Sequence, residues 1–62
     1  MDNYATVTVE ELDGSGRIWR RHTSHMVRAN VGTSVAAIRA GYNMNRTRIK
    51  VDGQLVADER RR

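Results

Sequence analysis

The sequence contains no cysteine, so neither a disulfide bond nor a thiolate metal site can stabilise its fold. Long hydrophobic runs are also missing. The longest covers residues 35–38, far below the roughly 20 residues that a membrane-spanning helix needs. The N-terminus lacks the basic segment followed by an apolar segment that is typical of a signal peptide. We therefore expect a protein without a membrane segment, located in the cytoplasm.

Lysine is almost absent, because only Lys50 among the 11 cationic residues is not an arginine. The planar guanidinium group suits phosphate and carboxylate partners. A GC-rich genome would produce the same bias without selection for binding, and the sequence leaves both explanations open. The formal net charge of +4 and the pI of about 10.7 favour polyanionic partners such as nucleic acids.

With 62 residues, of which 39% are hydrophobic, the chain has room for one domain with a small core. A domain of this size buries only about 60% of the surface that its unfolded chain exposes. A net charge of +4 is too small to enforce disorder. We expect a folded domain of marginal stability, made of one short helix and a sheet.

The first half of the chain predicts a β-hairpin. Residues 4–12 alternate apolar and polar side chains, which is typical of a strand buried on one face. Two glycines and two small polar residues follow at 13–16 and predict the turn. A second strand is expected over residues 17–31, with a bulge, a bend or a sheet-edge stretch near the polar residues 22–25.

The second half predicts a short helix followed by a second hairpin. The helix is expected near residues 34–40, with Thr33 or Ser34 as its N-cap and Gly41 in the left-handed conformation after its last turn. Strands follow at 47–51 and 54–57, joined by the two-residue turn Asp52-Gly53. The predicted fold class is α+β, with one domain over residues 4–57 and a charged tail at 58–62. The expected core consists of Val7, Val9, Val27, Val31, Val35, Ile38, Ile49 and Val51.

This order of elements resembles the β-grasp (ubiquitin-like) family, and its small sulfur-carrier members in particular. The resemblance is carried by two segments, Val31 to Ile38 with its Gly-Thr helix start, and Asn45 to Val56 with its Val-Asp-Gly turn. It implies an abbreviated β-grasp-like sheet of two hairpins packed on one short helix, and a role in protein recognition. Sulfur carriers end in Gly-Gly, whereas this chain ends in Asp58-Glu59-Arg60-Arg61-Arg62, so we do not expect carrier chemistry.

Catalytic, cofactor and metal sites are not expected. His22 and His25 are the only imidazoles, and three residues apart on a strand they point to opposite faces. No serine has a His-Asp partner pattern that would make it a nucleophile.

A non-enzymatic binding module is therefore the expected function. In the implied fold, Arg20, Arg28, Arg48 and Lys50 share the open sheet face and form a basic surface for partners. Trp19 or Tyr4 offers a stacking surface beside them, and the alternative for Trp19 is that it belongs to the core. We expect an adaptor that binds the acidic surface of a protein, and the alternative is a nucleic-acid-binding protein that uses the same arginines. The chain is expected to be a monomer or a homodimer paired through a sheet edge.

Overall fold

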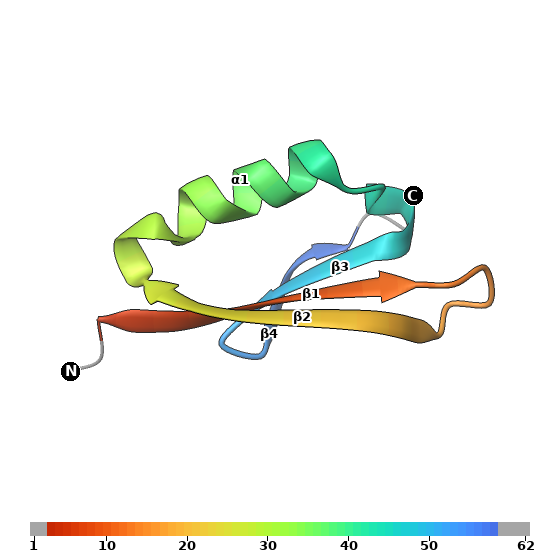
Figure 1. The fold of residues 1–62 in the computed structure, drawn as a ribbon, viewed down its shortest axis with the longest axis horizontal. Helices are drawn as coiled ribbons and strands as arrows, with labels where there is room; N and C mark the ends of the chain where they lie inside the picture. The colour runs from red at the N-terminus through yellow and green to blue at the C-terminus, as the bar shows by residue number, and fades with distance from the viewer. Residues whose placement is uncertain (1–2, 59–62) are drawn as a thin grey trace.

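The computed structural model describes residues 3–58 and consists of one antiparallel sheet with a helix on one face (Figure 1). This arrangement confirms the predicted α+β class. In chain order its elements are β1 (Tyr4–Leu12), β2 (Ile18–Val27), the 3-10 helix η1 (Arg28–Asn30), α1 (Val31–Gly41), the 3-10 helix η2 (Met44–Arg46), β3 (Thr47–Val51) and β4 (Gln54–Asp58).

The strand order is β2-β1-β3-β4, and each neighbouring pair is antiparallel. Because β2 and β3 both run antiparallel to β1, they are parallel to each other, with β1 between them. The segment η1–α1 connects them across one face of the sheet (Figure 1). The fold is thus a split β-α-β unit in which β1 is central.

The strand register divides the side chains between two faces. Val9 lies opposite His22 on β2 and Ile49 on β3, and these residues belong to the face that packs on α1, here called the helix-side face. Thr6, Thr8 and Glu10 alternate with them and belong to the opposite face, here called the open face.

The core is centred on Ile49, which is fully buried against Val7 and Ala57. The helix contributes Val31, Val35 and Ile38, which are half-buried against this cluster. Seven of the eight predicted core residues are therefore buried or half-buried, whereas the prediction for Val27 is wrong because its side chain is 42% exposed. The pattern missed the buried residues Ala5, Leu12 and Ala57.

The boundary between β2 and the helix differs from the prediction. β2 ends at Val27, and the segment that was predicted as its continuation to residue 31 is helical. The Arg28 amide donates to the Asn3 carbonyl (2.7 Å), which ties the start of η1 to the beginning of β1. Thr33 and Ser34 lie inside α1, and Asn30 is its N-cap without a side-chain capping bond.

Two turn predictions have different outcomes. Asp52 and Gly53 both have positive φ, 51° and 83°, as a type I′ turn requires, so the predicted hairpin turn is confirmed. Gly41 is the last residue of α1, and the extended Tyr42 ends the helix, so the predicted left-handed glycine cap is wrong.

The irregularity in the first hairpin lies elsewhere than predicted. β2 pairs with β1 without interruption from Arg20 to Val27, so a bulge or bend at 22–25 is excluded. The third expected form, a sheet-edge stretch, is confirmed, because β2 is an edge strand. The register instead shifts between Glu11 and Leu12, because Glu11 pairs with Arg20 while Leu12 pairs with Ile18. Trp19 is the extra residue of this bulge.

β4 ends at Asp58, and residues 59–62 of the predicted tail lie outside the described part of the chain. No helix within residues 3–58 is both long and apolar enough to cross a membrane.

Candidate binding face

A buried carboxylate lies at the centre of the charged part of the open face. Glu10 of the central strand β1 is only 2% exposed, although its side chain points away from the helix. Arg21 on β2 and Arg48 on β3 lie directly opposite Glu10 in the register. Their Nη2 atoms are 3.2 Å from Glu10 Oε2 and 3.0 Å from Glu10 Oε1, and Lys50 Nζ is 3.4 Å from Oε2. We call Glu10, Arg21, Arg48 and Lys50 the open-face cluster.

The electrostatics of the open-face cluster keep Glu10 ionised. Burial by itself would raise the pKa of Glu10, but contact with the Lys50 ammonium and the charges of Lys50, Arg48 and Arg21 together hold it below its ordinary value of 4.5. Three cations then surround one anion, which leaves two positive charges in excess. Arg21 is half exposed, and Arg48 and Lys50 are partly exposed, so the excess charge can reach an external anion.

The surroundings of the open-face cluster are polar. Thr8 lies two residues from Glu10 on the same face and pairs with Thr23 of β2. Further along, Thr6 Oγ1 is 3.0 Å from His25 Nδ1. Hydroxyl and imidazole groups thus continue the face beyond the cations, and both can donate or accept hydrogen bonds.

The structure separates the predicted binding residues. Arg48 and Lys50 share the open face, as predicted. Arg20 does not, because it pairs with Glu11 on the helix-side face, where its Nε is 3.6 Å from Glu11 Oε2. The residue that sequence reasoning missed is Arg21. Continuing the Leu12–Ile18 pairing without a bulge would place Arg20 opposite Glu10, and the extra residue Trp19 shifts the register so that Arg21 takes this place.

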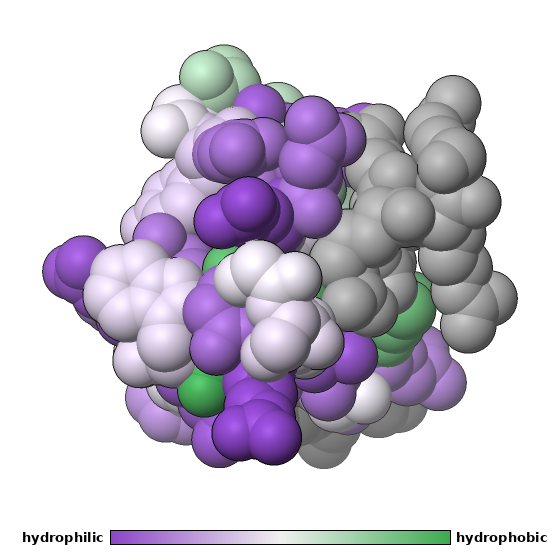
Figure 2. Space-filling view, turned by 90° about the vertical axis from the view of Figure 1, so that its right-hand side faces the viewer, coloured by the Kyte–Doolittle hydropathy of each residue, from purple (hydrophilic) through white to green (hydrophobic). Residues whose placement is uncertain are grey.

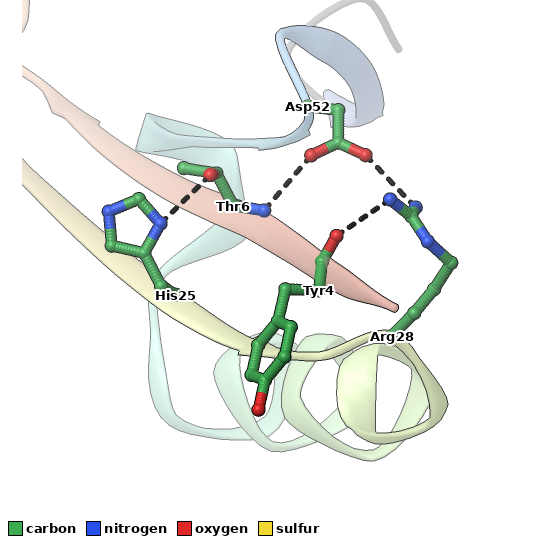
Figure 3. A network of polar contacts seen from close by, with 5 residues as sticks. All are labelled: Tyr4, Thr6, His25, Arg28 and Asp52. Carbon is green, nitrogen blue, oxygen red and sulfur yellow. Dashed lines mark hydrogen bonds and ion pairs between the residues drawn. The ribbon is translucent and has the colours of Figure 1, made fainter. Parts of the chain in front are cut away.

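Arg28 also lies off the open face and instead links three segments of the chain (Figure 3). Its Nη1 donates to Asp52 Oδ2 (2.9 Å) in the β3–β4 turn, and its Nη2 donates to the Tyr4 carbonyl (2.8 Å). The other Asp52 oxygen accepts from the Thr6 amide (3.0 Å). The prediction that Arg28 lies on the open face beside Arg48 and Lys50 is wrong, because β2 ends at Val27 and Arg28 begins the 3-10 helix η1.

Trp19 lies at the hairpin end of the molecule and is 60% exposed, so it is not a core residue. The Arg20 guanidinium carbon is 5.9 Å from the centre of its ring. Trp19 borders an open pocket of about 380 Å³, together with Leu12, Arg46 and Thr47 among others. Figure 2 looks onto this end and shows polar residues with small apolar areas between them.

The two histidines lie on opposite faces, as predicted. His22 Nε2 is 3.6 Å from Glu11 Oε2 on the helix-side face, whereas His25 contacts Thr6 on the open face. In the part of the chain that the structure describes, no group of three or more histidine, aspartate or glutamate residues is arranged to hold a metal ion.

Comparison with known proteins does not identify a family. No family model, no curated protein and no solved structure matches this chain.

Acid should destabilise the fold, because three carboxylates have a lowered pKa. Burial would raise the pKa of Glu10, but the surrounding cations lower it below its ordinary value. Hydrogen bonds from Ser15 lower the pKa of Asp13. Hydrogen bonds from the Thr6 amide and from Arg28 lower the pKa of Asp52. The stability that these three carboxylates give to the fold is fully present at a pH above their ordinary pKa values, 4.5 for Glu10 and 3.8 for the two aspartates. It is lost as the pH falls through their lower pKa values in the folded protein.

We therefore expect the melting temperature, measured by circular dichroism, to fall as the pH drops below about 4.5. Glu10→Gln should show a shallower dependence than the unmodified protein, since one of the three groups no longer titrates. A melting temperature that rises on acidification would contradict this expectation.

Proposed function

We propose that this chain is a small, non-enzymatic binding module whose open sheet face binds an acidic segment of a partner protein. The observation that carries the proposal is the open-face cluster, in which three cations surround one buried carboxylate on a face that the helix leaves uncovered. Glu10 fixes the positions of the three cations, so an acidic side chain would meet donors that are already oriented.

The arrangement of aromatic residues favours a protein partner over a nucleic acid. Single-stranded nucleic acids are bound by cations interleaved with aromatic rings on which bases stack. Tyr4, the exposed aromatic residue of the open face, lies six residues from Glu10 along β1, about 20 Å away at the rise of a strand. Trp19 borders the pocket together with Glu11 and Thr47, which belong to the helix-side face.

We also propose that the resemblance to the β-grasp family concerns the layers and the element order. A hairpin, a helix on one face and a second hairpin support it. β-Grasp sheets are mixed, with the first strand parallel to a later one, whereas β1 and β3 are antiparallel here. The resemblance therefore supports a recognition role by analogy of architecture alone. Location in the cytoplasm stays a prediction.

Arg20 and Arg21 provide a matched test of the binding proposal. Both are about half exposed, both are paired with a glutamate of β1, and they lie on opposite faces. We expect Arg21→Gln to weaken the binding of a glutamate-rich peptide by about 5- to 10-fold, because an oriented charged donor is lost. Arg20→Gln should change it by less than about 2-fold. Isothermal titration calorimetry measures both, and equal losses for the two variants would contradict the proposal.

A labelled oligothymidylate tests the alternative. If the partner is a nucleic acid, fluorescence anisotropy should detect binding of this probe, and the logarithm of affinity should fall with the logarithm of salt concentration by about one unit for each phosphate contact. If the oligonucleotide binds more tightly than the peptide and Arg21→Gln loses the oligonucleotide binding, the partner is a nucleic acid and not a protein. Binding of neither probe would contradict the proposed function.

A further inference from the structure

The outer edge of β2 is long and open. β2 has ten residues, and within residues 3–58 its one strand neighbour is β1. Eight of its residues are exposed, and only His22 and Met26 are half-buried. An edge strand of this kind presents unpaired amide and carbonyl groups that can pair with another strand.

The features that usually protect such an edge are weak in β2. The chain contains no proline, and the bulge at Trp19 affects only one end of the strand. The two arginines of β2 each contact a carboxylate of β1, Arg20 with Glu11 and Arg21 with Glu10, so both guanidinium groups are drawn toward β1 and away from the open edge. The other edge strand, β4, has five residues, and its pairing with β3 is irregular between Ile49 and Lys50.

We propose that two copies of this chain associate by antiparallel pairing of their β2 strands, centred on Thr23. The result is a continuous eight-stranded sheet with both helices on the same face, since a two-fold axis perpendicular to the sheet relates the copies. Residues directly opposite each other in an antiparallel pair have side chains on the same face. The symmetry axis must therefore lie midway between the two copies of one residue, so that this residue is paired with itself.

The positions of the arginines select Thr23 as the centre. With Thr23 opposite its own copy, residues 19–27 pair along nine positions, and Arg21 faces His25. With His22 at the centre, Arg21 would face Thr23 and lie diagonally beside Arg21 of the other copy, which brings like charges together. With Ser24 at the centre, the paired segment shortens to residues 21–27. The Thr23 register also gives a central Thr–Thr pair, which is a favourable cross-strand pair.

Analytical ultracentrifugation of the full chain tests the association. Because the interface consists of one strand from each copy, we expect a dimer with a dissociation constant of about 10 µM to 1 mM. Thr23→Lys places two like charges directly opposite each other and should weaken the dimer at least about tenfold. Thr33→Lys is the control, since Thr33 is an exposed residue of α1, and it should leave the dimer unchanged.

Disulfide formation tests the register, and the absence of natural cysteine makes each single-cysteine variant unambiguous. Directly opposite residues have Cα atoms about 4.5–5.5 Å apart, within the range for a disulfide. With diamide as oxidant, Thr23→Cys should form a covalent dimer at least about tenfold faster than Ser15→Cys, whose cysteine lies in the exposed hairpin turn.

Faster cross-linking of His22→Cys than of Thr23→Cys would overturn the register. A purely monomeric protein at about 1 mM, or equal cross-linking of Thr23→Cys and Ser15→Cys, would overturn the dimer. These outcomes do not depend on peptide binding, so the dimer and the acidic-partner proposal can fail separately.

Discussion

Ile49→Ala is expected to unfold a large part of the protein. Ile49 is fully buried on β3, between Val7 and Ala57, at the point where the helix packs on the sheet. Truncating a buried isoleucine costs about 2–5 kcal/mol, because apolar contacts are lost and a cavity remains. At about 0.05–0.15 kcal/mol per residue, a chain of 62 residues has a total stability of about 3–9 kcal/mol.

Urea denaturation followed by circular dichroism measures this loss. Ile18→Ala is the matched control, since Ile18 lies at the start of the edge strand and is 38% exposed; it should cost less than about 1 kcal/mol. Ile38→Ala should fall between the two, because Ile38 is only half-buried. An equal loss for Ile18→Ala and Ile49→Ala would mean that the helix does not pack on this face.

Glu10→Ala is expected to have the second largest effect, about 2–3 kcal/mol of lost stability. Without the carboxylate, Arg21, Arg48 and Lys50 remain close together with no anion between them. The repulsion between these partly exposed cations should be screened by salt, so the loss should be smaller at about 1 M than at about 0.05 M sodium chloride.

The neighbouring glutamate provides the control for this prediction. Glu11 contacts Arg20 and His22 at 3.6 Å and is more exposed than Glu10, so Glu11→Ala should cost less than about 1 kcal/mol. Thermal melts of both variants at two salt concentrations give the comparison. A Glu11→Ala variant that is as unstable as Glu10→Ala would show that Glu10 has no special role.

Which arginines lie on the open face is not determined by β2 alone. Alternation along residues 20–28 places Arg20 and Arg28 on the same face only if the strand is regular and continues to residue 28. The bulge at Trp19 sets which arginine faces Glu10, and the 3-10 turn at Arg28 removes that residue from the sheet. Neither event has a marked signal in the sequence, because both depend on pairing with β1.

The sequence by itself determined the two hairpins, the single helix between them and the Asp52-Gly53 turn, because strand alternation and positive-φ turns depend on residues that are close along the chain. Only the tertiary structure decided where the helix begins, that Trp19 is exposed, and that Arg21 rather than Arg20 joins Arg48 and Lys50 around Glu10. These features depend on the register between strands and on how far a short helix can cover a four-stranded sheet. Both are set by contacts between residues far apart in the sequence, whose effects a local pattern does not contain.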